Sequence, residues 1–396
     1  MRKIVFCRVL PMLLFALVAV SSVMSAEKTV DLTATDGIKL KASFFPAAKP
    51  GPGVLLLHQC NRDRKSWDVL AQRLAASGIN VLTFDLRAFG ESGDTPRDKA
   101  TQDETRAELA KWPGDVDAAF QYLVTQPGVK KDLIGVGGAS CGVNNSIQAA
   151  IRHPEQVRSL VLLAGPTDSA GRQFLRKTST VPVLFGYADD DEFPDSITDI
   201  QWLYSLDASP GKKMVRYADG KHGAEIFDVH PEFVQVITDW YVTTLIKTPG
   251  HALPSPPFAL PQQVQTLTTL DQPGGVAKVE AQLKEARQQD PKAKLFPEEQ
   301  VNIMGYERLQ AGETEAALEI FKLNALAYPG SPNVYDSLGD AYLAAGQKDL
   351  ARDSAKMTLE VLASDTMDDQ QRRDLIKASA EQKLKQLGDE GQTKAQ

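Results

Sequence analysis

The feature that most constrains this chain is a five-residue turn, Gly-Ala-Ser-Cys-Gly, at residues 138–142. An apolar run at 133–137 precedes the turn and is typical of a buried parallel strand, whereas residues 143–151 after it predict a helix. A strand, a G-x-S-x-G turn and a helix form a nucleophile elbow, in which small flanking residues let the serine rise above the sheet. We therefore predict that Ser140 is a nucleophile.

Residues 28–248 alternate strand and helix patterns on both sides of this elbow. Further strands are expected at 30–45 (a hairpin with its turn at Asp36-Gly37), 53–57, 81–86, 159–163, 181–186 and 213–217. Such alternation predicts an α/β domain, a mostly parallel sheet covered by helices on both faces. Only a short segment separates Gly165 from Val181, so we expect no large lid over the site.

The first residues of the chain are typical of a secretory signal peptide. Three basic residues lie among the first eight, an apolar run interrupted only by Pro11 covers 9–20, and small residues follow at 23–26. The apolar run is too short for a typical membrane-spanning helix. We predict a signal peptide at 1–26 and a periplasmic or secreted protein, with an uncleaved membrane anchor as the alternative.

Net charge and cysteine content narrow the class of protein further. The formal net charge of −7 argues against a nucleic-acid partner and against binding to acidic membranes. No later segment is long and apolar enough to span a membrane after signal removal. Cys60 and Cys141 are the only cysteines after residue 26, too few for a disulfide scaffold. The chain must therefore fold on an ordinary hydrophobic core.

The C-terminal third of the sequence differs in character. Residues 249–272 begin as a proline-rich stretch that predicts a semi-rigid linker, and 273–396 are helical with a repeat interval of 34 residues. The matching residues are Gly305 and Gly339, Leu309 and Leu343, Ala311 and Ala345, Gly312 and Gly346, and Ala317 and Ala351. We predict a small all-α domain of tetratricopeptide type, with a protein or peptide as its candidate partner. We expect it to fold separately from the α/β domain, with docking on that domain as the alternative.

Several motifs in residues 28–248 occur together in one family. They are His58-Gln59-Cys60, the segment from Asp85 to Ser92, the elbow, the segment from Gly186 to Asp189, and the segment from Gly220 to Gly223. On these motifs the region resembles the α/β-hydrolases, and within them the dienelactone-hydrolase-like proteins. Dienelactone hydrolases proper use a cysteine nucleophile, whereas the elbow here centres on Ser140. This departure points to ester hydrolysis rather than to a dienelactone substrate.

A serine nucleophile needs a general base and an acid that orients the base, and this fold supplies them in the order serine, acid, histidine. His222 lies in a glycine-flanked loop after the last predicted strand and is the expected base. The acid is expected after the strand that ends at Gly186. Counting forward from that strand selects Asp189, our preferred residue, and counting back from Pro194 selects Asp190.

The oxyanion that develops during acyl transfer needs two backbone N–H donors. One is expected from Cys141, and the other from the loop after the strand at 53–57, where the resemblance indicates Cys60. Gln59 stands where the family usually has glycine. Two converging donors bring their Cα atoms close, so a Cys60–Cys141 disulfide is feasible, and two buried reduced cysteines are the alternative that the sequence leaves open.

Together these residues favour an exported hydrolase of carboxylic esters, acting on a small-molecule or chain-end ester without a metal or organic cofactor. Two alternatives remain open. One is a peptidase that uses the same three residues, and the other is a non-enzymatic assembly protein that acts through its helical repeats. The complete set of serine, histidine and acid favours an enzyme.

Overall fold

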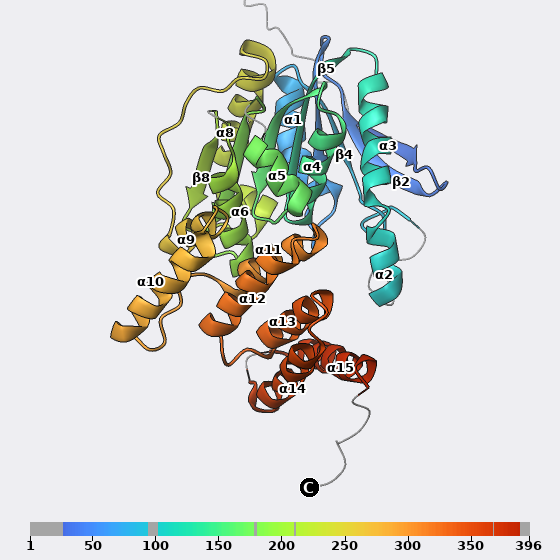
Figure 1. The fold of residues 1–396 in the computed structure, drawn as a ribbon. Coiled ribbons are helices and arrows are strands. Elements are labelled where there is room, and N and C mark those ends of the chain that lie inside the picture. Colours follow the sequence, from blue (N-terminus) through green and yellow to red (C-terminus); the bar gives the residue numbers. More distant parts are fainter. Residues whose placement is uncertain (1–26, 94–101, 178–179, 210, 367, 389–396) are drawn as a thin grey trace, which may run out of the picture.

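The computed structural model describes residues 27–93, 102–177, 180–209, 211–366 and 368–388 (Figure 1). The predicted signal peptide at 1–26 lies outside the described residues. Among the helices that are described, none is long and apolar enough to cross a membrane.

An eight-stranded sheet forms the centre of the molecule. Its strands are β1 (Lys28–Thr33), β2 (Lys39–Phe45), β3 (Gly51–Leu57), β4 (Asn80–Phe84), β5 (Val129–Ala139), β6 (Val157–Leu163), β7 (Val183–Ala188) and β8 (Lys213–Tyr217). They lie in the order β1-β2-β4-β3-β5-β6-β7-β8, and all neighbours except β1–β2 and β2–β4 are parallel. The predicted mostly parallel sheet is confirmed, and the carboxyl ends of β3 to β8 meet at one edge.

Helices cover both faces of this sheet (Figure 1). They are η1 (Arg64–Trp67), α1 (Asp68–Ala76), α2 (Gln102–Leu109), α3 (Trp112–Thr125), α4 (Cys141–Arg152), α5 (Ser169–Lys177), α6 (Pro194–Leu206), η3 (Gly223–Glu225), α7 (Ile226–Val229), α8 (Glu232–Tyr241) and η4 (Val242–Lys247). Helices α1 and α8 contribute to one buried apolar cluster, and α3 to α6 contribute to the other. Among the described residues of the short segment between β6 and β7, the structure has one helix, α5.

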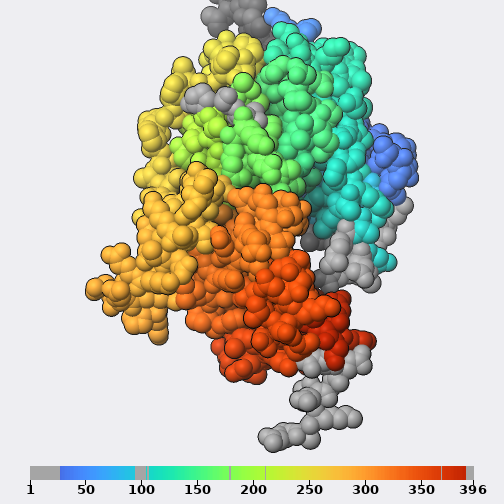
Figure 2. All heavy atoms as spheres, viewed as in Figure 1, coloured from blue at the N-terminus to red at the C-terminus, as the bar shows by residue number. Residues whose placement is uncertain are grey.

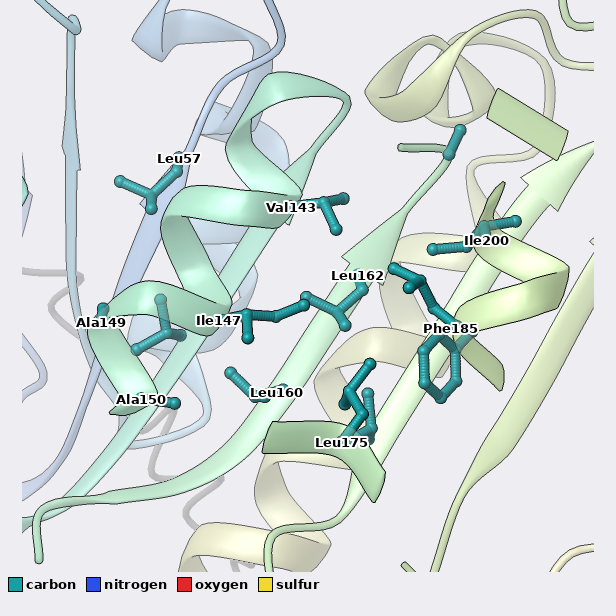
Figure 3. Packing of buried hydrophobic residues seen from close by; sticks show 14 of the residues in the cluster. Leu57, Val143, Ile147, Ala149, Ala150, Leu160, Leu162, Leu175, Phe185 and Ile200 are labelled. Carbon is teal, nitrogen blue, oxygen red and sulfur yellow. The ribbon is translucent and has the colours of Figure 1, made fainter. Parts of the chain in front are cut away.

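Helix α4 is fixed to the sheet directly after the elbow. Figure 3 shows Val143 and Ile147 of α4 beside Leu160 and Leu162 of β6, with Phe185 of β7 beyond them. The two helix residues are four positions apart and the two strand residues are two apart, so each pair lies on one face of its element. All five side chains are buried, which fixes the start of α4, and with it the elbow, against the sheet.

The central strand β5 is rich in glycine because a tyrosine occupies the space beside it. A Cβ on Gly135 would approach the Tyr241 ring to 2.6 Å, and one on Gly137 would approach its hydroxyl to 2.8 Å. Tyr241, at the end of α8, is completely buried. Since larger residues in β5 would displace this ring, the glycines let the last helix of the α/β domain pack closely against the central strand.

After residue 248, all the regular elements that the structure describes are helices. They are α9 (Gln262–Leu270), α10 (Gly275–Gln289), α11 (Glu298–Gln310), α12 (Thr314–Ala327), α13 (Pro332–Ala344), α14 (Lys348–Ser364) and α15 (Gln370–Gln386). Gly312 and Gly346 have φ values of 78° and 71°, the left-handed conformation that glycine favours after a helix. The repeat interval therefore recurs in the backbone, and the assignment of these helices to the tetratricopeptide family stays a prediction.

This helical region packs directly on the α/β domain. Figure 2 shows the two regions in contact, and one apolar cluster continues from the sheet into α9, α10 and α11. Buried Arg172 of α5 pairs with Glu307 of α11, and Gln300 donates to buried Asp199 of α6 at 3.2 Å. Helix α9 already begins at Gln262, inside the predicted linker. The structure thus shows the helical region docked on the α/β domain, and the prediction that the α/β domain folds without it stays a prediction.

Candidate active site

Ser140 lies in a sharp turn between β5 and α4, with φ 53° and ψ −121°. The turn requires glycine around it. A Cβ on Gly138 would meet the Gly142 carbonyl oxygen at 2.1 Å, one on Gly142 would meet that of Leu57 at 2.4 Å, and one on Gly165 would meet that of Ser140 at 2.4 Å. Only glycine therefore fits at these positions, and the turn leaves Ser140 partly exposed at the carboxyl edge of the sheet.

His222 lies after β8 and forms a buried pair with an acid. Its Nδ1 donates to Oδ2 of Asp191 at 2.8 Å, and both side chains are almost completely shielded from solvent. The other oxygen of Asp191 accepts from the backbone N–H of Phe193 at 2.8 Å. With both oxygens engaged, the carboxylate is fixed in orientation and fixes the imidazole in turn.

The prediction that Asp189, or else Asp190, contacts His222 is therefore wrong. Asp189 forms an exposed ion pair with Arg216, and Asp190 accepts from the backbone N–H of Lys221 at 2.9 Å, a bond that lowers the Asp190 pKa. Strand β7 continues to Ala188, and the Asp189 N–H still bonds across to β8. The chain turns only afterwards, so the carboxylate that reaches His222 comes two positions later than expected.

Three consecutive aspartates concealed this register in the sequence. The available signal is local, because Asp191 accepts from the N–H two residues ahead, the pattern of an Asx turn just before the helix that begins at Pro194. Phe193, which follows this turn, stacks its edge on the His222 ring at a centroid distance of 4.7 Å and remains half exposed. It is a further residue at the site that the sequence analysis did not identify.

The loops that carry Ser140 and His222 meet through their neighbouring residues. A Cβ on Gly223 would lie 3.0 Å from the Cβ of Ala139 and 2.5 Å from Oε1 of Gln59. Gly223 directly follows His222, and Ala139 directly precedes Ser140. The fold thus brings the elbow, the histidine loop and the loop after β3 together.

Cys60 and Cys141 form a disulfide, with their Cα atoms 5.9 Å apart. The bond joins the loop after β3 to the first residue of α4, which is one of the two open possibilities at these positions. The N–H groups at the start of a helix have no partner within it. The Cys141 N–H is therefore available to a ligand, and the disulfide keeps the Cys60 backbone close to it.

His58, the first residue of this loop motif, has a structural position. Its Nδ1 donates to the Gln59 carbonyl at 2.8 Å and its Nε2 accepts from the Leu86 N–H at 3.0 Å. This pairing requires the neutral ring, and burial lowers the pKa of His58 in agreement. His58 therefore connects the loop after β3 to the loop after β4 and takes no proton from a substrate.

A pocket of about 940 Å³ opens beside Cys60. Val69, Phe89 and Phe227 contribute apolar walls, and the ion pair of Arg62 with Glu225 lies at its border. The pocket offers room for one side of a substrate next to the disulfide. No group of three or more His, Cys, Asp or Glu side chains that could bind a metal ion occurs within the described part of the chain.

Comparison with known proteins agrees with this architecture. Residues 52–182 match the family model of the alpha/beta hydrolase fold. The protein thus has an α/β-hydrolase fold, with an all-helical region added after it. The family model matches only this central segment, so the likeness concerns the fold and not the whole chain.

Individual relatives are distant. The thiohydrolase aneE of Aspergillus aculeatus is 31% identical over 130 residues, 31% of this chain and 38% of its own length. The chain thus spans well under half of that relative. The protein YfhR of Escherichia coli K12 is 24% identical over 244 residues, 56% of this chain and 82% of its length.

Two solved structures are similar to part of this chain. The Pyrococcus furiosus esterase Pf2001 has 20% identity and a TM-score of 0.43, covering 56% of this chain and 93% of the esterase. A dienelactone hydrolase of Anabaena variabilis has 20% identity and a TM-score of 0.44, covering 56% of this chain and 99% of that one.

Proposed function

We propose that the protein is an exported serine hydrolase that cleaves carboxylic esters with Ser140, His222 and Asp191. The observation that carries this proposal is the buried hydrogen bond of 2.8 Å between His222 Nδ1 and Asp191, at the sheet edge where the elbow presents Ser140. Because Asp191 accepts the Nδ1 proton, the other ring nitrogen, Nε2, is the one that can act as a base.

The reaction follows from these positions. His222 Nε2 takes the hydroxyl proton while Ser140 Oγ attacks the acyl carbon, and the N–H groups of Cys60 and Cys141 stabilise the oxyanion. The C–O bond to the leaving alcohol then breaks, and His222 returns its proton to that alkoxide. Water, deprotonated by the same histidine, attacks the acyl-enzyme, and the carboxylic acid leaves as Ser140 regains its proton.

A thioester is the second candidate substrate, favoured by the similarity of part of this chain to a thiohydrolase. The same residues would perform both reactions, since only the leaving atom differs. Rates on p-nitrophenyl acetate, on an acyl thioester of the same chain length and on a small peptide anilide would separate ester, thioester and peptide hydrolysis.

The deciding experiment is replacement of the nucleophile. Ser140→Ala should fold normally and lose activity by a factor on the order of 10⁶, as in related triads. It should also lose all labelling by a fluorophosphonate probe. Cys141→Ala should be much milder, because only the backbone of that residue is required. Near-normal turnover by a folded Ser140→Ala variant would refute the proposal.

Export is proposed from the sequence of residues 1–26. The Cys60–Cys141 disulfide supports it, since disulfides persist mainly in oxidising compartments. Fractionation of cells that express the full chain, with N-terminal sequencing of the soluble product, tests it. Recovery of the uncleaved chain in the membrane fraction would favour the anchor instead.

A further inference from the structure

Gln59 is a fully buried polar residue whose side chain crosses from the loop after β3 to the histidine loop. Its Oε1 accepts from the Ala224 N–H at 2.8 Å, and its Nε2 donates to the His222 carbonyl at 3.2 Å. The side chain amide therefore bonds to the backbone on both sides of Gly223. Its nitrogen also donates to Asn61 at 2.8 Å within its own loop.

The orientation of this amide is fixed by its partners. A backbone N–H can only donate and a backbone carbonyl can only accept, so the Gln59 oxygen must face Ala224 and its nitrogen must face His222. No other side chain of similar size presents an acceptor and a donor in this geometry without a charge. Gly223 permits the approach, because any Cβ there would lie 2.5 Å from the Gln59 oxygen.

The histidine loop needs such support because its backbone is strained. Gly220, Lys221 and Gly223 have φ values of 137°, 62° and 59°, and a left-handed conformation is unfavourable for a residue such as Lys221. Asp190 accepts from the N–H of Lys221, the residue before His222, and Asp191 accepts from the His222 ring. Gln59 binds the segment after it, and so completes the attachment of this loop.

We infer that Gln59 is a positioning residue that keeps His222 aligned with Ser140 and with the oxyanion donor at Cys60. This inference rests on the proposed function. It explains why a long polar side chain occupies a place where the resembling family has glycine. Cys60 directly follows Gln59, so one short loop sets both the oxyanion donor and the base.

Gln59→Met tests this role, because methionine has a similar length and makes neither hydrogen bond. Its kcat on p-nitrophenyl acetate should fall by about 10²-fold, the effect of displacing a catalytic group by roughly 1 Å, and its KM should change little. Gln201→Met is the matched control. Gln201 lies on α6, is also buried, and donates a hydrogen bond to the Tyr187 hydroxyl of β7 at 2.8 Å. The control should keep the kcat of the unmodified protein.

A double variant separates positioning from general damage. In a His222→Ala background Gln59→Met should reduce the residual rate less than twofold, because no base remains to be positioned. An equal fractional loss in both backgrounds, or an unchanged kcat in the single variant, would overturn the inference. If Gln59→Met does not fold, the isosteric Gln59→Glu, which lacks the donor, replaces it. Loss of activity in Ser140→Ala with an unaffected Gln59→Met would refute only the role of Gln59.

Discussion

Two buried carboxylates in this molecule bind a basic side chain, with different results. In the candidate active site Asp191 accepts from His222 at 2.8 Å. In the helical region Asp336 of α13 accepts from Lys383 of α15, also at 2.8 Å. The pairs are alike in burial and in distance, yet only the first lies where a reaction is expected.

The difference is in the remaining hydrogen-bonding capacity. Lys383 gives its three donors to Asp336, Asp340 and Ser379, each at 2.8 Å. Asp340 in turn binds the Tyr306 hydroxyl of α11, so the network joins three helices and is complete. The His222 ring bonds only through Nδ1 within the described residues, which leaves Nε2 for the proposed proton transfer. A complete network fixes the position of helices, whereas an incomplete one is available for chemistry.

Asp191→Asn should give the largest effect and break the first pair. Asparagine keeps the shape but favours the wrong histidine tautomer, so kcat should fall by about 10⁴-fold, as in related triads. Asp189→Asn, which disrupts only an exposed ion pair, is the control and should retain most activity. Steady-state kinetics on a p-nitrophenyl ester measures both. A larger loss at Asp189 would restore our original prediction.

Lys383→Met breaks the second pair and should affect stability alone. It leaves Asp336 buried without its cation, so unfolding in urea should show a loss of about 3–5 kcal/mol. The exposed Lys377→Met on the same helix should change stability by less than about 0.5 kcal/mol. The activity per folded molecule should remain unchanged at 25 °C. A reduced kcat in folded Lys383→Met would show that the helical network reaches the active site.

Asp199 provides an intermediate case, a buried carboxylate whose bonding partner, Gln300, is neutral. Burial raises the pKa of Asp199 from 3.8 to about 6. The unfolded chain releases this proton near pH 4 but the folded protein retains it to about pH 6, so stability falls as pH rises through that window and the penalty persists above it. Asp199→Asn should thus stabilise the protein at pH 8 by at most about 3 kcal/mol, and hardly at pH 4.

Melting temperatures of the unmodified protein and of Asp199→Asn, taken at pH 4 and at pH 8, measure this change in stability. The gain at pH 8 should exceed the gain at pH 4. Equal gains at both values would mean that Asp199 titrates normally at the interface between the two regions.

Reduction of Cys60–Cys141 should give the smallest effect. The two N–H donors remain when the bond opens but lose their cross-link, so kcat should fall about tenfold, less than the ~10²-fold or more caused by deleting a donor. A variant with alanine at both positions should not respond to reductant. Intact mass after alkylation under denaturing conditions gives the redox state. Two alkyl groups added before reduction would show free thiols.

The sequence predicted the scaffold better than the site. Strand β8 lies where expected, and β5 ends directly before Ser140, because buried apolar runs followed by glycine determine such elements locally. The acid could not be placed to the residue, since three adjacent aspartates are equivalent until the end of β7 is known. Asp191 is separated from the expected residue by only two positions, yet these decide whether a carboxylate faces solvent or His222.

The role of Gln59 and the docking of the helical region were less accessible still. Both depend on partners more than a hundred positions away, such as Ala224 for Gln59 and Gln300 for Asp199. No local pattern encodes such a pairing. The disulfide could be predicted in part. The expected convergence of two backbone donors made it feasible but did not determine the directions of the two cysteine side chains.

The contact between Asp199 and Gln300 also has a consequence for biosynthesis. These residues are 101 positions apart, and the chain emerges from the ribosome with its N-terminus first. At a synthesis rate of about 5–20 residues per second, α11, which covers α6, is made on the order of 5–20 s after α6. During this interval the surface around Arg172 and Asp199 faces the surroundings of the nascent chain. The residues that the last third of the chain covers therefore stay uncovered until that third is made.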